Sequence, residues 1–230
     1  MARTKDLDNI KAQKERIVDK AVSLFIKNGY DKTSINEIIE QTGISKGVFY
    51  HYFNSKEDLI DYLGRQIFIA VLPDLEDLVN DKNYDALTKL KKSFRLIKSY
   101  KVKNRQKIMM MATVMYRDEN LYLKNRLNKI SSELFVPIFG RILRQGKKEK
   151  TFDIGDPAEI MMSMSMGMAD VVMPIILEHK YSPKTIMLFL KKAKTFKRSL
   201  NRVLGIKKGE LDLFDRATLD KILRGFKGLK

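Results

Sequence analysis

The chain has 230 residues, of which 44% are hydrophobic and 32% are charged, and this is enough for one or two globular domains with a buried core. Because it has no cysteine and only two histidines, His51 and His179, disulfide scaffolds, thiol nucleophiles and most metal sites are excluded, and we expect no cofactor and no metal. The formal net charge of +17 is typical of proteins that attract polyanions such as DNA.

The positive charge is unevenly distributed along the chain. Residues 89–150 hold 18 basic and 4 acidic side chains, and residues 180–230 hold 15 and 4. Either a functional basic surface or a compositional bias towards lysine explains this excess. The N-terminal segment has charges every few residues, and no run approaches the roughly 18 apolar residues of a membrane span. We therefore expect a cytoplasmic protein with no membrane partner.

Helical periodicity dominates the sequence, so the predicted fold class is all-α. Apolar residues follow helical spacing in the first segment, and Asn28-Gly29 is a left-handed stop that ends this helix near Asn28. Ser34 followed by Glu37 is a capping-box pattern, which predicts a short second helix that ends at Gly43. The apolar residues of these two helices are Ile17, Ala21, Leu24, Phe25, Ile35, Ile38 and Ile39.

Two further helix starts follow. Ser45 is predicted to cap a third short helix, in which Phe49 and Phe53 share the buried face. Ser55 is predicted to cap a fourth helix. Short helices joined through Gly43-Ile44 indicate a helix-turn-helix, in which the second helix enters the DNA major groove.

The stretch from Thr33 to Leu59, TSINEI through GISKGVFYHYFNSKEDL, closely resembles the DNA-binding domain of the TetR family of bacterial transcriptional regulators. The resemblance covers about residues 12 to 62. It implies a three-helix helix-turn-helix domain over 1–54 and a helical ligand-binding and dimerisation domain over 55–204. The apolar spacing and basic residues of 205–230 predict a basic, helical appendage. Later helices are expected at about 56–79, 85–103, 105–116, 119–148, 156–179 and 182–204, with Asp156-Pro157 as one helix start.

The family motif implies which residues meet DNA. Lys46, Tyr50 and His51 are the outward positions of the third helix and are expected to contact base edges or phosphates, while Gly47 allows close backbone approach. Tyr52 fits either a phosphate contact or packing. Helix starts bind phosphates, and the residues expected there are Thr33, Ser34, Ser45 and Lys56. The three hydroxyl residues are also expected to cap their helices.

Ten of the twelve methionines fall in two clusters, at 109–115 and 161–173. Flexible thioethers suit a pocket for hydrophobic ligands, although ordinary core packing explains the same pattern. Asp170 is either a polar anchor for a cationic ligand or a solvated or interface-paired carboxylate. The residues expected to line such a pocket are Met111, Met115, Met164, Met168 and Asp170.

The basic segment 89–98 is either a solvated helix face or a site for an acidic ligand such as an acyl-coenzyme A. Phosphate-binding loops and a nucleophile elbow are absent from the sequence, so an enzyme is not expected. The resemblance implies a homodimeric regulator, usually a repressor, that binds a palindromic operator in double-stranded DNA and is released by an unidentified small-molecule inducer. A non-specific architectural DNA-binding protein is the alternative.

Overall fold

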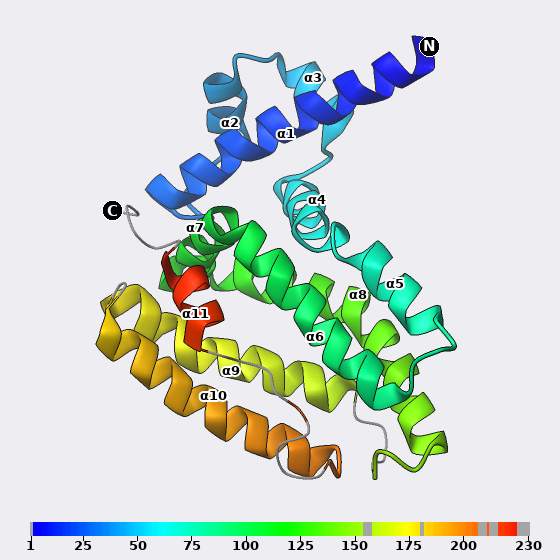
Figure 1. Cartoon of the computed structure of the whole chain (residues 1–230). Coiled ribbons are helices and arrows are strands. Elements are labelled where there is room, and N and C mark those ends of the chain that lie inside the picture. The colour runs from blue at the N-terminus through cyan, green and yellow to red at the C-terminus, as the bar shows by residue number, and fades with distance from the viewer. Residues whose placement is uncertain (1, 154–157, 180–181, 207–210, 212–215, 225–230) are drawn as a thin grey trace. The chain divides into compact units, whose positions relative to one another are not determined.

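The computed structural model describes residues 2–153, 158–179, 182–206, 211 and 216–224, and every regular element in these ranges is a helix (Figure 1). The all-α prediction is therefore confirmed. The helices are α1 (Ala2–Asn28), α2 (Ile35–Thr42), α3 (Lys46–Tyr52), α4 (Lys56–Ile69), α5 (Leu72–Asn80), α6 (Ala86–Lys103), α7 (Arg105–Met115), the 3-10 helix η1 (Asp118–Asn120), α8 (Leu121–Lys148), α9 (Ala158–His179), α10 (Pro183–Val203) and α11 (Arg216–Leu223).

The chain forms two compact units that are not contiguous in sequence. One unit contains residues 1–66 and 111–127, and the other contains residues 67–110 and 128–230. We call them the N-terminal unit and the C-terminal unit. Helices α4, α7 and α8 each run from one unit into the other, so the N-terminal unit includes the turn between α7 and α8.

The N-terminal unit is built on α1 to α3, the first part of α4 and the α7–α8 turn. Helix α1 packs against α2, and α2 contacts α3. Phe49 and Phe53 are both buried, as their shared helix face predicts. The two rings lie 6.0 Å apart between centroids, and the Phe53 ring also meets Tyr62 of α4 edge to face. Aromatic packing therefore fixes α3 against the start of α4.

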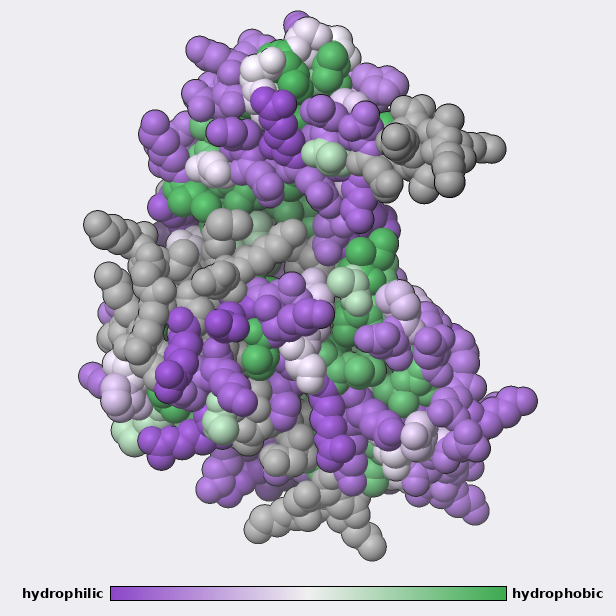
Figure 2. Space-filling view, turned by 45° about the horizontal axis from the view of Figure 1, so that its top comes forward, coloured by the Kyte–Doolittle hydropathy of each residue, from purple (hydrophilic) through white to green (hydrophobic). Residues whose placement is uncertain are grey.

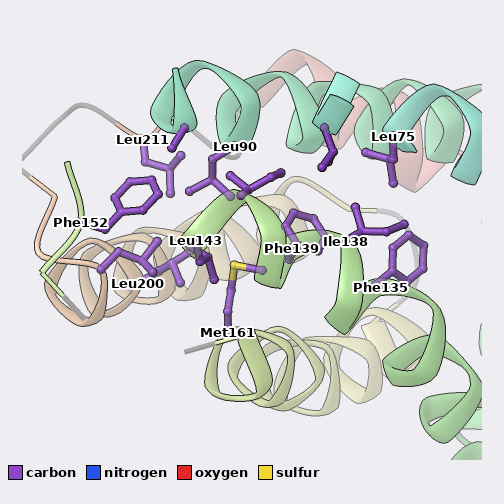
Figure 3. Close-up of a cluster of buried hydrophobic side chains, with 14 of the residues drawn as sticks. Leu75, Leu90, Phe135, Ile138, Phe139, Leu143, Phe152, Met161, Leu200 and Leu211 are labelled. Atoms are coloured by element: carbon purple, nitrogen blue, oxygen red, sulfur yellow. The ribbon is translucent and has the colours of Figure 1, made fainter. Parts of the chain in front are cut away.

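The C-terminal unit contains a large hydrophobic cluster. It brings together buried side chains from α5, α6, α8, α9 and α10, and Figure 3 shows them converging on Phe139 and Leu143 of α8. Phe152 and Leu211 lie outside the helices but are buried in the same cluster. A smaller cluster, with Val172 and Ile176 of α9 and Ile186 of α10 as its buried residues, joins these two helices. Helices α9 and α10 therefore form one packed layer, and α11 contacts both α10 and α6.

Two helix predictions need correction or fall outside the described residues. The helix expected over 56–79 is two helices, because α4 ends at Ile69 and α5 begins at Leu72 with a proline in its first turn. The predicted start at Asp156-Pro157 lies outside the described residues, as does most of the appendage over 205–230, of which α11 is described.

No helix among the described residues is long and apolar enough to cross a membrane. On the face drawn in Figure 2, hydrophilic side chains cover most of the described surface and hydrophobic ones form small patches.

Candidate nucleic-acid interface

Helix α3 presents a polar, exposed face opposite its two buried phenylalanines. Its exposed residues are Lys46, Gly47, Val48, Tyr50 and His51. The chain has no acidic residue from Gln41 to Lys56, so no carboxylate of α3 would repel a phosphate. This face therefore combines hydrogen-bond donors, a cation and an apolar side chain, which are the groups that read base edges in the major groove.

The turn that positions α3 follows the predicted local rules. Gly43 has a left-handed conformation with φ of 66°, and its N–H donates to carbonyls at the end of α2. Ser45 then caps α3, because its side chain accepts a hydrogen bond from the Val48 N–H at 3.3 Å. These contacts set the direction in which α3 leaves α2.

Helix α2 begins with the predicted capping box. The Glu37 N–H donates to Ser34 Oγ at 3.1 Å, and the Ser34 N–H donates to Glu37 Oε2 at 2.7 Å. The hydrogen bonds from Ser34 hold the pKa of Glu37 below its usual value. The Ser34 hydroxyl lies at an exposed helix N-terminus, where an anion is favoured.

Tyr30 is the centre of the turn between α1 and α2. Its ring stacks on Tyr122 with a centroid distance of 5.6 Å and an interplanar angle of 10°, and it meets Phe25 edge to face. Its hydroxyl donates to Glu57 Oε1 at 3.2 Å. Burial and the neighbouring Glu57 carboxylate raise the pKa of Tyr30. The Tyr30 phenol therefore stays neutral at physiological pH.

Lys56 closes the same turn from the start of α4. Its ammonium donates to the carbonyls of Tyr30 at 2.7 Å and Thr33 at 2.9 Å, and it lies 4.0 Å from the centroid of the Tyr30 ring. Burial lowers the pKa of Lys56, and the nearby carboxylates Asp31, Glu57 and Glu37 oppose this shift. The structure thus assigns the Lys56 ammonium to the α1–α2 turn, whereas the sequence predicted an ammonium turned towards phosphate.

Thr33 also differs from its predicted role as an exposed phosphate ligand. Its side chain is 1% exposed, and its hydroxyl donates to the Gly29 carbonyl at 2.8 Å. Thr33 therefore holds the turn. Tyr52 is half-buried and meets His51 edge to face, with 5.0 Å between ring centroids. The predicted DNA-contact residues that the structure exposes together are Ser34, Ser45, Lys46, Gly47, Tyr50 and His51.

Several residues that sequence reasoning missed hold the α1–α2 turn from the α7–α8 turn. Asn120 is fully buried, accepts from the Tyr30 N–H and donates to the Val114 carbonyl at 2.7 Å. Arg117 donates to the Ile26 carbonyl at the end of α1. A separate missed contact joins α8 to α4, where Arg126 forms two 2.5 Å hydrogen bonds with Asp61. Val48 is also absent from the predicted DNA-contact residues. Its position next to the buried Phe49 predicts that it lies on the exposed side of α3.

Comparison with known proteins agrees with this arrangement. The sequence profile of the bacterial regulatory proteins of the tetR family matches residues 17–63, which include α2, α3 and the start of α4. The HTH-type transcriptional regulator YerO of Bacillus subtilis is 50% identical over 48 residues, or 21% of this chain and 17% of that protein. Residues 17–63 therefore form a helix-turn-helix domain of the TetR-family type.

Other relatives match a larger part of the chain. The fatty acid metabolism regulator protein of Bacillus subtilis is 24% identical over 156 residues, which is 67% of this chain and 78% of that protein. The crystal structure of the regulator FadR of Bacillus subtilis, in complex with stearoyl-CoA, superposes with a TM-score of 0.56 at 22% identity. The superposition covers 84% of this chain and 99% of FadR, so the fold of the two proteins is similar beyond the helix-turn-helix.

The predicted ligand residues fall in different units. Met111 is buried and Met115 half-buried in the N-terminal unit. Met164 packs against the large cluster of the C-terminal unit, Met168 packs against the small one, and Asp170 is exposed. A surface hollow in the described part of the chain is lined instead by Pro183, Ile186, Arg216, Ala217 and Asp220. Among the described residues, no group of three His, Asp or Glu side chains could hold a metal ion.

Proposed function

We propose that this protein is a homodimeric repressor that binds an inverted-repeat operator through α3 and leaves it when a small hydrophobic molecule binds the C-terminal unit. The exposed face of α3, with Lys46, Tyr50 and His51 and no acidic side chain, is the observation that carries the proposal. Duplex DNA in the cytoplasm is the expected partner.

In this proposal some residues contact the bases or phosphates of the DNA, and others position the helices that carry those contacts. Lys46 reaches a guanine edge or a phosphate, Val48 contacts a thymine methyl group, and Tyr50 and His51 donate to bases or phosphates. Ser34 and Ser45 bring exposed helix N-termini to the DNA backbone. Thr33 and Lys56 act through the α1–α2 turn that they close.

Selection of bound sequences from random duplex DNA tests this function. Two α3 helices related by a two-fold axis should select an inverted repeat whose half-sites lie about one helical turn, or a multiple of it, apart. The Lys46→Ala variant should lose about 1 to 3 kcal/mol of operator binding for each lost contact and relax the preference at one position of each half-site. A single asymmetric half-site would overturn the dimeric proposal, and equal binding to unrelated sequences would favour the architectural alternative.

We further propose an acyl chain with an anionic head group as the inducer class. FadR of Bacillus subtilis was crystallised with stearoyl-CoA, and its fold is similar to this chain. Methionines of α9 pack in or against both hydrophobic clusters of the C-terminal unit, and thioethers adapt to long apolar ligands. Helix α6 adds Lys91, Lys92 and Arg95 for an anionic head group, whereas Lys89 is buried and donates to the Val79 carbonyl and to Gln145.

Titration of the protein–operator complex with stearoyl-CoA, free stearate and coenzyme A tests the inducer class. Release requires that the ligand binds the DNA-incompetent conformation more tightly than the DNA-bound one. We expect stearoyl-CoA to release the operator and coenzyme A alone to leave it bound, because only the former fills an apolar site. If neither acyl compound bound while the operator was still recognised, the inducer class would be wrong and the regulator function would stand.

A further inference from the structure

The exposed side of helix α10 is strongly basic. Its 21 residues include seven Lys and Arg and no Asp or Glu. The opposite side of the helix is buried through residues such as Ile186, Ala193 and Leu200. Six of the seven basic side chains are exposed, on the side of α10 that does not pack against the rest of the C-terminal unit, and Lys197 is half-buried.

Four of these cations form one straight row. Lys184, Lys191, Arg198 and Arg202 are exposed and are separated by seven, seven and four residues, which places them within a narrow arc of the helix surface. At 1.5 Å per residue the row is about 27 Å long. No hydrogen bond or ion pair joins these four side chains to other residues in the part of the chain that the structure describes. We call these four residues the α10 row.

The charge of the protein is concentrated in the unit that carries this row. The C-terminal unit has 31 basic and 16 acidic residues, whereas the N-terminal unit has 14 and 12. The helix-turn-helix unit is therefore close to neutral, although a DNA-binding surface gains most of its non-specific affinity from phosphate contacts. Phosphate-binding charge is available mainly in the C-terminal unit.

From this placement we infer that the α10 row is a second nucleic-acid surface, which binds the phosphate backbone of duplex DNA without reading its sequence. Duplex DNA carries one negative charge per about 1.7 Å of its axis, so a straight row of cations about 27 Å long faces phosphates over roughly eight base pairs. The α10 row of a second protein molecule is not a suitable partner for this surface, because the two rows of cations would repel each other.

Other partners fit the row less well than DNA. An amphipathic helix that binds a membrane needs an apolar face, and a protein interface needs an apolar centre. Met187, which is 66% exposed, is the one large hydrophobic residue of α10 that is exposed. The inference goes beyond the proposed function, because it holds whatever sequence α3 reads.

The first test measures binding to a duplex of random sequence. The full-length chain carries Lys46→Glu in every sample, so that α3 contributes little. The row variant changes Lys184, Lys191, Arg198 and Arg202 to Gln. The control variant changes Lys82, Lys103, Arg144 and Lys147 to Gln, four exposed residues of the same unit, and therefore has the same net charge. Circular dichroism checks that both variants remain helical.

The row variant and the control should differ in their dependence on salt. Each phosphate contact contributes about 0.9 to the slope of log affinity against log salt concentration, so the row variant should lose about two to four units of slope. The control should lose less than one unit. Equal losses in the two variants would overturn the inference, because they would show an effect of net charge and not of the row.

The second test uses the protein with Lys46 intact, bound to the operator that selection returns. A second, differently labelled random duplex should join this complex in an analytical ultracentrifuge, and the row variant should fail to recruit it while it still binds the operator. Binding of wild-type protein to vesicles that contain phosphatidylglycerol, without recruitment of the duplex, would overturn the inference in favour of a lipid partner. Failure of the selection to return any operator would instead count against the proposed function and would leave the outcome of the first test unaffected.

Discussion

The main-chain N–H of Tyr30 donates to Asn120 Oδ1, although the two residues are 90 positions apart in the sequence. The Asn120 amide also donates to the Val114 carbonyl, so one fully buried side chain joins the end of α7 to the α1–α2 turn. This turn leads directly into the capping box of α2. The start of α2 is therefore held by the α7–α8 turn, which lies far from it in the sequence.

The Asn120→Ala variant should destabilise the N-terminal unit by about 1 to 3 kcal/mol, because the Tyr30 N–H and the Val114 carbonyl would lose their partner inside the protein. Urea unfolding followed by circular dichroism measures this change. The matched control is Asn125→Ala, an exposed position of α8, which should change the free energy of unfolding by less than about 0.5 kcal/mol. Equal stability of the two variants would show that the buried amide contributes nothing.

Lys56 and Lys46 separate a positioning role from a DNA-contact role. Because the Lys56 ammonium donates to two carbonyls, Lys56→Gln should lower the free energy of unfolding by about 1 to 3 kcal/mol. The exposed Lys46 should behave in the opposite way, with unchanged stability in Lys46→Gln and a salt slope of operator binding that falls by about 0.9. If Lys56→Gln left stability unchanged and lowered the salt slope by the same amount, Lys56 would be a phosphate ligand.

The pH dependence of stability should report on Tyr30. Burial raises its pKa above the ordinary value of 10.0, so the folded state keeps this proton while the unfolded state loses it. The contribution of Tyr30 to stability is therefore complete below about pH 10 and is lost as the pH rises further. Tyr30→Phe cannot ionise, and its free energy of unfolding should fall less steeply than that of the wild type between about pH 9 and pH 11. Parallel curves from denaturant titrations would refute this.

Gly47 should show a conflict between stability and DNA binding. A Cβ atom at this position would have Ser45 Oγ at 3.9 Å as its nearest neighbour, which is an ordinary contact. Alanine is also the better helix former, so Gly47→Ala should stabilise the fold by up to about 1 kcal/mol. The added methyl group would separate α3 from the DNA, and the operator affinity measured by fluorescence anisotropy should fall. Unchanged affinity would mean that the DNA does not approach Gly47 closely.

The sequence predicts those parts of the N-terminal unit that depend on neighbouring residues. The capping box of Ser34 and Glu37, the left-handed Gly43 and the cap at Ser45 all involve partners within five positions, and each is present in the structure. The burial of Phe49 and Phe53 also follows from local helical spacing. Helix caps and helix faces depend on residues that are close in the sequence, so these features can be predicted without a structure.

The sequence does not predict contacts that join distant segments. Lys56 stands at a helix start, where a phosphate site is expected, but Tyr30 and Thr33 from the preceding turn accept its hydrogen bonds. Asn120 and Arg117 carry no motif, because the carbonyl and amide groups that they bind belong to α1 and the α1–α2 turn. Whether methionines on α9 line a pocket depends on side chains from other helices, which periodicity alone cannot supply.

The exposed face of α9 is where we expect the dimer to form. Ile160 and Val171 are 50% and 49% exposed, and they lie on one line of the helix with Gly167 and Pro174, which are also exposed. Met166, by contrast, packs against the large hydrophobic cluster of its own protomer. An exposed apolar strip with a glycine at its centre allows two copies of α9 to approach closely, whereas the basic row of α10 would keep two copies apart.

Val171→Lys should therefore yield a monomer, because burying an unpaired ammonium at an interface costs several kcal/mol. Met187→Lys is the matched control, because it adds the same charge at an exposed position of α10 and should leave the dimer intact. Sedimentation velocity measures the molecular mass of both variants, and operator titration should show that the monomer binds weakly, since one α3 holds a single half-site. A dimeric Val171→Lys together with a monomeric Met187→Lys would place the interface on α10 and would also remove the surface that we assign to DNA.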